Sequence, residues 1–229
     1  MEGRVPKGVM FVLASVSDAA QEASFNDWYN GQHLPEVTRP GIFVNATRYV
    51  NSGAKGTPED PRFLAVYETE REDVAQAWKE NASHRSEWGA MHPALKVGLA
   101  AVYKSIGSTA KPPKGKRTSG VLVALTDCAD AKKEAEFNKW YDEMHVPDVL
   151  KTGLYWSAQR FIHTDPKPGQ PKYLALYETE GDGPGTLKAL AGKLPKDRGS
   201  PLSAVRQVLA FNLTYSQSQA KAKVKVGRA

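Results

Sequence analysis

A twelve-residue segment that occurs twice is the feature that most constrains how this chain can fold. Residues 25–36 read FNDWYNGQHLPE, and residues 137–148 read FNKWYDEMHVPD. A second matching pair, RFLAVYETE at 62–70 and KYLALYETE at 172–180, lies at nearly the same offset. Self-similarity of this extent predicts two structurally equivalent halves in the 229-residue chain.

Each half is expected to follow the order β-α-β-β-α-β, which is the ferredoxin-like order. In each, an apolar strand precedes a helix that Asp18 or Asp130 can cap. Pro35 and Pro147 are expected to end these helices, near His33 and Met144, because the residue before a proline is pushed out of the helical region. The other expected elements are strands at 8–15, 43–51, 62–70, 96–106, 121–125, 156–164, 172–180 and 203–215, and second helices at 72–84 and 186–194.

The strands are apolar on both faces, as the segment 63–67 (FLAVY) illustrates. A strand with two apolar faces needs two packing partners, and the other half of the chain can supply the second. We therefore predict an α+β fold of two tandem ferredoxin-like repeats packed sheet to sheet, as an intramolecular pseudo-dimeric α+β barrel. The expected domains are 1–107 (first repeat), 108–119 (basic Pro/Gly linker), 120–216 (second repeat) and 217–229 (basic flexible tail).

The net charge of +6 arises from two short segments rather than from the folded repeats. Without the eight basic residues in those segments, 23 basic and 25 acidic residues remain, so no nucleic-acid partner is expected. The eight are Lys111, Lys114, Lys116, Arg117, Lys221, Lys223, Lys225 and Arg228.

The cysteine content and the apolar runs bear on the expected location of the protein. The single cysteine, Cys128, excludes an intramolecular disulfide. The apolar run 9–16 recurs at 121–125, so we interpret it as a strand rather than a signal peptide. No run reaches the roughly 20 residues that span a bilayer. We expect a cytoplasmic protein with no membrane partner.

Aromatic and histidine side chains recur every four residues along the first helix of each half. This face can simply be core packing, with Trp28 and Trp140 beside it. The histidines are expected at a helix end, where the dipole and burial oppose each other and bring the pKa near neutrality. They could then move protons, or only bond a last-turn carbonyl. The residues on this face are Phe25, Tyr29, His33, Phe137, Tyr141 and His145.

Matched polar residues could complete a site. Asn26 and Asn138 could contact a ligand or form a surface hydrogen bond. Arg48 and Arg160 could hold a substrate carboxylate or phenolate, but the interpretation that we favour is an arginine–glutamate pair with the matched Glu68 and Glu178 on the neighbouring strand.

Histidines and tryptophan outside the repeat distinguish the halves. His84, Trp88 and His92 have no counterpart in the second half, so the first cleft is expected to be better enclosed, which favours His33 over His145. No carboxylate completes a metal site with the two histidines. The chain also lacks a phosphate-binding glycine loop, a dinucleotide fingerprint and a nucleophile elbow. We expect neither a metal nor another cofactor.

The pattern FNxWYxxxHxP[DE], followed by a glycine and an arginine-bearing strand, resembles the dimeric α+β barrel superfamily, and most of all its EthD-like members. The resemblance covers nearly the whole chain as two fused copies. Members are usually single-repeat homodimers, which implies a covalent pseudo-dimer and leaves a further homodimer open. The superfamily includes polyketide cyclases, muconolactone-type isomerases, cofactor-free monooxygenases and haem-degrading enzymes.

The resemblance and the residues together suggest a cofactor-independent enzyme for an apolar aromatic or polyketide-like carbonyl compound. Its reaction would be a cyclisation, isomerisation or dehydration, that is, a lyase or isomerase activity. The proposed catalytic residues are His33, His145, Tyr29 and Tyr141, and the proposed substrate-binding residues are Trp28, Trp140, Asn26, Asn138, Arg48 and Arg160. The alternatives are a non-catalytic ligand-binding or assembly protein, a haem protein, since other two-repeat chains of this architecture hold haem, or a cofactor-free monooxygenase.

Overall fold

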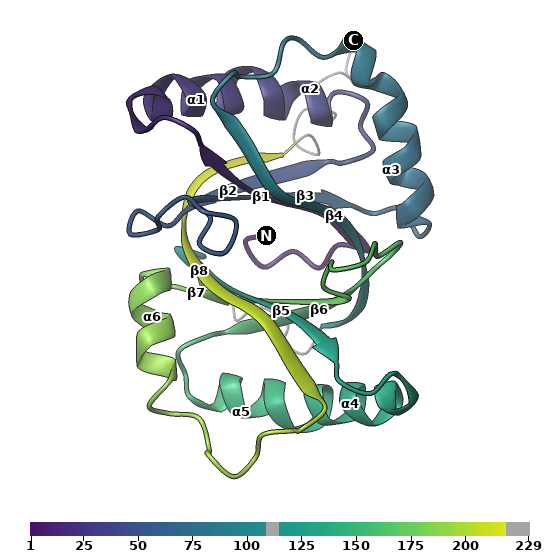
Figure 1. Cartoon of the computed structure of the whole chain (residues 1–229), viewed down its shortest axis with the longest axis vertical. Helices are drawn as coiled ribbons and strands as arrows, with labels where there is room; N and C mark the ends of the chain where they lie inside the picture. The colour runs from purple at the N-terminus through teal and green to yellow at the C-terminus, as the bar shows by residue number, and fades with distance from the viewer. Residues whose placement is uncertain (109–114, 219–229) are drawn as a thin grey trace. The chain divides into compact units, whose positions relative to one another are not determined.

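The computed structural model describes residues 1–108 and 115–218 (Figure 1). The predicted linker falls outside these residues at 109–114, and the predicted tail at 219–229. The described chain contains eight strands: β1 (Gly8–Val16), β2 (Asn45–Val50), β3 (Phe63–Thr69), β4 (Leu95–Ser108), β5 (Gly120–Cys128), β6 (Ser157–His163), β7 (Tyr173–Thr179) and β8 (Ser203–Ser218).

The helical segments follow the same order in both halves of the chain. The first half has η1 (Ala19–Gln21), α1 (Glu22–Trp28), η2 (Tyr29–His33), α2 (Leu34–Thr38), α3 (Val74–Ser83) and η3 (His84–Glu87). The second has η4 (Ala131–Lys133), α4 (Glu134–Trp140), η5 (Tyr141–His145), α5 (Val146–Lys151) and α6 (Gly183–Leu190). The predicted caps are confirmed, since Asp18 accepts a hydrogen bond from the amide of Ala20 and Asp130 from that of Lys132.

The sheet order corrects the predicted fold class. The eight described strands follow the order β1-β3-β2-β8-β5-β7-β6-β4 and close into one barrel. The prediction of two tandem ferredoxin-like repeats, packed sheet to sheet as an intramolecular pseudo-dimeric α+β barrel, was therefore wrong. The reason lies in β4 and β8, which run longer than predicted. Each provides an edge for strand pairing beyond its own repeat, at β6 for β4 and at β2 for β8.

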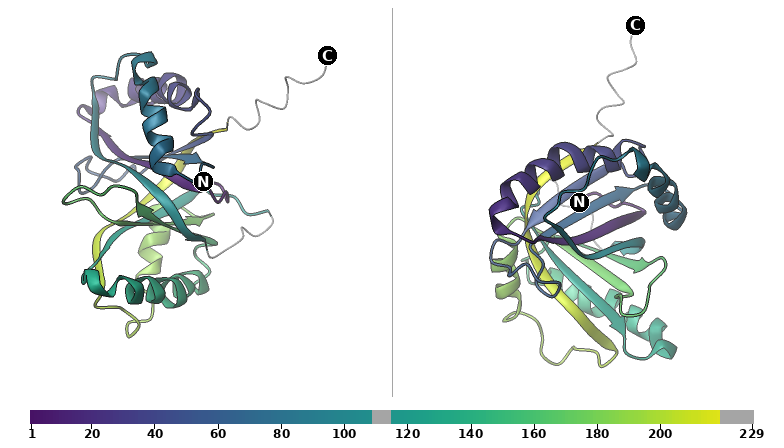
Figure 2. Two further views of the ribbon diagram at one scale, coloured as in Figure 1. Left: turned by 90° about the vertical axis from the view of Figure 1, so that its right-hand side faces the viewer. Right: turned by 45° about the horizontal axis from the view of Figure 1, so that its top comes forward.

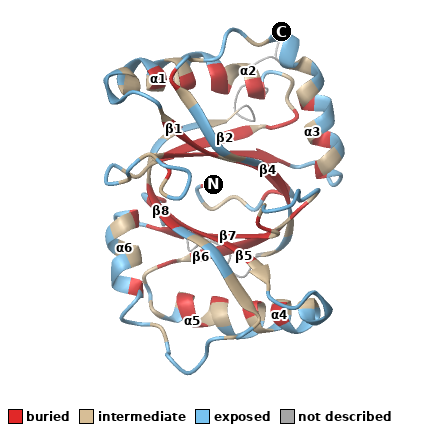
Figure 3. Ribbon diagram, viewed as in Figure 1, coloured by how far each residue is buried: buried red, intermediate tan, exposed pale blue. Residues whose placement is uncertain are grey.

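The chain divides into two compact units whose boundaries cut through these two long strands. Unit 1 comprises Met1, Pro6–Lys104 and the described residues from Leu213 on, and unit 2 comprises Glu2–Val5 and Ser105–Asn212. In unit 1, α1 and α2 lie across the strands and α3 lies beside them (Figure 2). Six strands, β1, β2, β3, β5, β6 and β7, are buried along most of their length, whereas β4 and β8 are more exposed and each helix is buried on one side only (Figure 3).

The predicted burial of both strand faces is confirmed, since all seven residues of β3 and all seven of β7 are buried. Phe63, Ala65 and Tyr67 join the cluster beneath the helices of unit 1. Because successive side chains of a strand point to opposite faces, Glu68 lies on the other face. This alternation decides which side chains of each sheet can contact the helices.

The two prolines do not end the first helices, contrary to prediction. The chain continues through Pro35 to Thr38, and through Pro147 to Lys151. A proline inside a helix removes a hydrogen bond and crowds the preceding turn. Here a wide π turn precedes each proline, at η2 and η5, and each proline lies within the first two positions of a new α-helical segment, where a missing N–H is tolerated.

The second helix of unit 2 begins three residues earlier than predicted. Asp182 caps it by accepting a hydrogen bond from the amide of Gly185. Gly183, its first residue, lies so close to β8 that an added Cβ would approach the carbonyl oxygen of Phe211 to 2.3 Å. The glycines that made this segment look like a poor helix former thus allow α6 to pack directly on the sheet.

Candidate functional site

The two π turns hold the predicted histidines against aromatic rings. The amide of Leu34 bonds the carbonyl of Tyr29, five residues earlier, and Val146 bonds Tyr141 in the same way. His33 consequently stacks on Trp28, with ring centroids 4.9 Å apart, and His145 stacks on Trp140 at 5.1 Å. π turns inside helices are frequent at functional sites.

The tyrosine one turn earlier completes each aromatic group. The rings of Tyr29 and His33 meet edge to face with centroids 4.9 Å apart, and those of Tyr141 and His145 at 4.8 Å. The structure therefore brings together the tryptophan, tyrosine and histidine that the sequence predicted as site residues, in both units.

Burial lowers the pKa of His33 and of His145 to about 4. The nearby carboxylates, Glu36 for His33 and Asp148 for His145, raise the pKa only in part. The predicted pKa near neutrality was wrong, because neither histidine ends a helix and so neither gains the helix-terminus effect. Both rings are neutral at pH 7 and can accept a proton.

Lowering the pH from about 7 to about 4.5 is expected to reduce the free energy of unfolding. Unfolded His33 takes up a proton near 6.5 and folded His33 only near 4, so the unfolded state gains protons first as the pH falls. The full difference corresponds to about 3 kcal/mol for this buried side chain. Urea unfolding at the two pH values measures the loss, which His33→Gln should reduce and His84→Gln, at an exposed position, should leave unchanged. An equal loss in both variants would contradict this account.

Arg48 binds the first helix rather than the neighbouring strand. It is 2% exposed, and its Nη1 and Nη2 donate to the side-chain oxygens of Asn30 at 2.8 Å and Asn26 at 2.9 Å. Its guanidinium carbon lies 4.1 Å from the centre of the Tyr29 ring. The favoured arginine–glutamate pair was wrong, because Arg48 pairs with Ala65 in the β2–β3 register and Glu68 lies on the other face of the sheet.

Arg160 makes the corresponding contacts in unit 2. It donates to the side-chain oxygens of Asn138 at 2.7 Å and Asp142 at 2.8 Å, and lies 4.2 Å from the centre of the Tyr141 ring. The residues predicted to bind substrate, Asn26 with Arg48 and Asn138 with Arg160, are therefore brought together in pairs. We call each set, Asn26–Asn30–Arg48 and Asn138–Asp142–Arg160, the arginine clamp of its unit.

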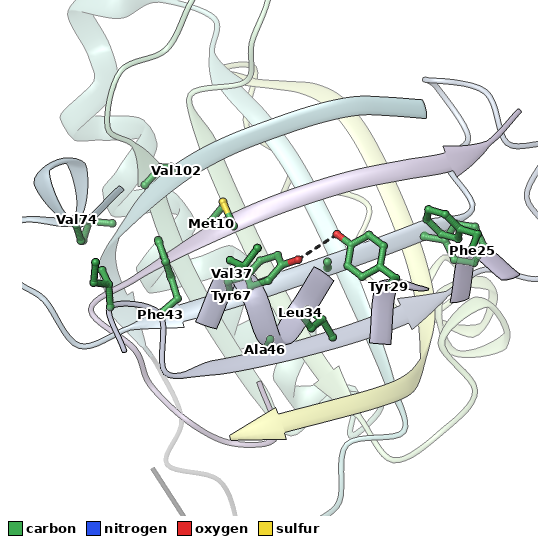
Figure 4. Close-up of a cluster of buried hydrophobic side chains, with 14 residues drawn as sticks. Met10, Phe25, Tyr29, Leu34, Val37, Phe43, Ala46, Tyr67, Val74 and Val102 are labelled. Carbon is green, nitrogen blue, oxygen red and sulfur yellow. Dashed lines mark hydrogen bonds between the residues drawn. The ribbon is translucent and has the colours of Figure 1, made fainter. Parts of the chain in front are cut away.

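A second tyrosine, which sequence reasoning did not select, lies beside each predicted one. In unit 1 the Tyr67 hydroxyl donates to the Tyr29 hydroxyl at 3.2 Å, inside the apolar cluster (Figure 4). In unit 2 the equivalent Tyr177 hydroxyl is buried and forms no hydrogen bond of normal geometry with the described residues. The signal was available, because both tyrosines occupy the same place in the repeated segments at 62–70 and 172–180.

Burial raises the pKa of Tyr141 and, more strongly, that of Tyr177. The neighbouring Tyr141 raises the pKa of Tyr177 further. Both phenols therefore stay protonated at neutral pH. Beside them, the neutral His145 offers a proton acceptor. Unit 2 thus places one acceptor and two donors within a single aromatic group.

A cavity of about 220 Å³ opens beside these three side chains of unit 2. It lies between the α4–α5 segment, α6 and the strands β5 and β8. Its wall is largely apolar, and Val205 and Val208 at its edge are 59% and 45% exposed. The lining residues are Leu122, Ala124, Thr126, Tyr141, His145, Val149, Tyr177, Leu187, Leu190, Ala191, Leu194, Ser203, Val205 and Val208.

Smaller side chains in unit 2 account for this cavity. Leu95 pairs with Val16 in unit 1, and Ser203 pairs with Cys128, which is the equivalent of Val16 in the repeat. Trp78 and Leu187 each occupy the fifth position of their helix, α3 or α6. Leucine and tryptophan therefore fill space in unit 1 where unit 2 has serine and leucine.

Unit 1 also packs Trp88 against His33, with ring centroids 5.7 Å apart. Trp28, Trp78, Trp88 and Leu95 all pack against the buried cluster of this unit. The better enclosure that the sequence predicted for the first half thus takes the form of two tryptophans packed against His33, and the cavity of about 220 Å³ lies beside His145.

Within residues 1–108 and 115–218, no group of three or more His, Cys, Asp or Glu side chains is arranged to hold a metal ion. Nor does that part of the chain contain a helix long and apolar enough to span a membrane.

Comparison with known sequences gives one partial match. No protein-family model matches the chain. Core atranone cluster protein 1 of Stachybotrys chlorohalonatus is 40% identical over 62 residues, which are 27% of this chain. The matched part is 26% of that relative, so the chain spans about a quarter of its length.

Solved structures match over nearly the whole chain. A dye-decolorizing peroxidase from Bacteroides thetaiotaomicron has a TM-score of 0.61 at 10% identity, covering 96% of this chain and 95% of that one. A mutant chlorite dismutase from Candidatus Nitrospira defluvii has 0.57 at 9%, covering 93% of each. An anthrone oxidase-like protein has 0.56 at 8%, covering 96% of each. The chain therefore shares its overall fold with these proteins, whereas the matches do not support the EthD-like assignment.

Proposed function

We propose that this protein is an enzyme that removes a proton from an enolisable, apolar aromatic or polyketide-like ketone in the cavity of unit 2. The observation that carries the proposal is that one cavity is lined by a neutral histidine, His145, and by two protonated phenols, Tyr141 and Tyr177. Proton transfer from carbon needs a base on one side and a hydrogen-bond donor for the developing oxyanion on the other.

The proposed step balances within these residues. His145 takes the proton from the carbon next to the carbonyl, and the electron pair of the broken C–H bond moves to the carbonyl oxygen as an enolate. Tyr141 and Tyr177 donate hydrogen bonds to that oxygen. The enolate then lies beside the new imidazolium, and this opposite charge offsets the burial that lowers the pKa of His145 in the free protein.

Cyclisation, isomerisation and dehydration of such ketones can all begin with this step, and so can a cofactor-free monooxygenation. The names of two similar proteins support a substrate of secondary metabolism, namely an anthrone oxidase-like structure and a protein of an atranone cluster. We assign the reaction to unit 2. Tyr29 and His33, predicted as catalytic with their counterparts, keep a packing role in this proposal.

Haem fits the cavity poorly. A volume of about 220 Å³ lies below the range of pockets that enclose drug-sized ligands, and a tetrapyrrole is larger than those. Among its described lining residues the cavity has no lysine or arginine for the propionates. We therefore derive no step through haem.

Deuterium uptake by 2-tetralone in D₂O, followed by NMR, tests the proposal without knowledge of the natural substrate. We expect the wild type to exchange the protons next to the carbonyl faster than buffer does. His145→Gln should reduce this rate at least about 100-fold, because it removes the base. Tyr177→Phe should reduce it by about tenfold or more, because it removes one oxyanion donor.

His33→Gln is the matched control, since His33 has the equivalent aromatic neighbours in unit 1 and does not line this cavity, and its exchange rate should stay within about twofold of the wild type. Undiminished exchange in His145→Gln would contradict the assigned base. Binding of 2-tetralone without exchange above the buffer rate would instead support the alternative, a non-catalytic ligand-binding protein.

A further inference from the structure

A second, more polar cavity adjoins the apolar one and shares His145 with it. Its volume is about 300 Å³, and it also shares Leu194, Ser203 and Val205 with the apolar cavity. The residues that belong to it alone include Asp148, Arg198 and Ser200. The histidine therefore stands at the boundary between an apolar and a polar compartment.

Arg198 is held in this second cavity from both its backbone and its side chain. Its carbonyl accepts a hydrogen bond from Trp140 Nε1 at 3.0 Å, and its Nη1 donates to Asp148 at 2.8 Å. Asp148 is 8% exposed, whereas the arginine side chain is 47% exposed. A guanidinium has five N–H donors in a planar fork, so one carboxylate contact leaves donors for a further acceptor.

In unit 1 the corresponding acid bonds a backbone amide rather than an arginine. Glu36 occupies the position of Asp148 in the repeated motif and accepts a hydrogen bond from the backbone amide of Gly89 at 3.0 Å. The indole nitrogen of Trp28, the counterpart of Trp140, has no hydrogen-bond partner among the described residues. Of these two acids, the one that pairs with an arginine therefore lies in unit 2, beside the apolar cavity.

We propose that the second cavity is an oxyanion subsite in which Arg198 binds a carboxylate group of the substrate. This proposal rests on the proposed function of the same site. It defines the substrate class as an aromatic or polyketide-like acid, with its apolar rings in the first cavity and its anionic group in the second. The carbon that loses the proton then lies beside His145, between the two. Arg198 is a specificity residue, because its planar guanidinium group matches the geometry of a carboxylate and can donate two parallel hydrogen bonds to it.

Calorimetric titration with three two-ring probes tests the subsite. Naphthalene reports the apolar cavity alone, and 2-naphthoate and 2-naphthamide differ in charge but little in shape. We expect the wild type to bind 2-naphthoate about tenfold more tightly than 2-naphthamide, as a charged hydrogen bond predicts. In Arg198→Gln this preference should fall to within about twofold, while the affinity for naphthalene is unchanged.

Two further variants separate direct contact from a structural effect. Asp148→Asn weakens the same Asp148–Arg198 contact but keeps the cation, so the preference for 2-naphthoate should persist or increase. Arg206→Gln removes an arginine that pairs with Asp127 outside both cavities, and the preference should persist. Loss of the preference in Asp148→Asn as well would overturn the proposal, as would its survival in Arg198→Gln or its absence from the wild type.

Naphthalene distinguishes the two ways of failing. If the wild type binds naphthalene but does not prefer 2-naphthoate, the oxyanion subsite fails and the proposed function stands. If it binds none of the probes, both fail together.

Discussion

Replacing Asn26 with leucine is expected to lower the free energy of unfolding by about 3 kcal/mol, the largest loss of stability that we predict for a single polar side chain. The side-chain oxygen of Asn26 accepts a hydrogen bond from Arg48, a cation that is 2% exposed. Removing one acceptor leaves a buried charged donor without compensation, which costs more than a neutral hydrogen bond contributes. Chemical denaturation measures the loss.

Two comparisons show whether the arginine clamp is the cause. Asn30→Asp copies Asp142 of the second clamp and should keep the stability within about 0.5 kcal/mol or raise it, because an ion pair replaces a neutral acceptor. Asp27→Leu alters an exposed position of the same helix and should have little effect. A loss in Asn26→Leu no larger than that in Asp27→Leu would refute the structural role of the clamp.

Filling the cavity of unit 2 is expected to abolish its function while sparing the fold. The double variant Ala124→Val and Ser203→Leu gives unit 2 the residues that unit 1 has at the equivalent positions, Val12 and Leu95. Naphthalene affinity and 2-tetralone exchange should each fall at least about 100-fold, because the added groups occupy the space of the ligand. Stability should rise by about 1–2 kcal/mol, because those groups bury apolar surface.

The reciprocal change in unit 1, Val12→Ala with Leu95→Ser, is the matched control. It should cost about 3 kcal/mol through cavity formation and leave exchange at His145 unchanged. Retained exchange in the filled variant would show that the reaction does not take place in this cavity, whatever the effect on stability.

The repeat itself revealed much of the secondary structure. Duplication of the segments 25–36 and 62–70 predicted paired helices and strands, and the acids Asp18 and Asp130 identified helix starts by a local rule that tertiary structure did not override. Helix ends were harder to predict. A proline such as Pro35 normally stops a helix. Here a π turn, closed by the hydrogen bond from the Leu34 amide to the Tyr29 carbonyl, allows the helical chain to continue.

Barrel closure could not be read from the repeat, because it depends on how far β4 and β8 extend past the residues that resemble each other. The contacts of Arg48 were also hidden from the sequence. The matched arginine and glutamate on adjacent strands suggested a cross-strand pair. The register, however, pairs Arg48 with Ala65, and Glu68, three residues further along β3, points to the opposite face of the sheet.

The proposed site draws on the residues that the sequence selected, but its location in unit 2 was not predicted. The sequence identified the tyrosine and histidine of both helices from their spacing. It did not reveal which half is open, because that depends on side-chain volumes at positions far apart in the chain, such as Trp78 against Leu187 and Leu95 against Ser203. Only the strand register and the helix starts show that these residues occupy equivalent places.

The most direct test of the account is a titration of the wild-type protein with naphthalene, observed through the imidazole resonances of its histidines by NMR. The resonances of His145 should shift with naphthalene concentration, whereas those of His33 in unit 1 should stay in place. Assignment with His145→Gln and His33→Gln makes the distinction unambiguous. A shift confined to His33, or none at either histidine, would contradict the claim that the cavity of unit 2 is the functional site.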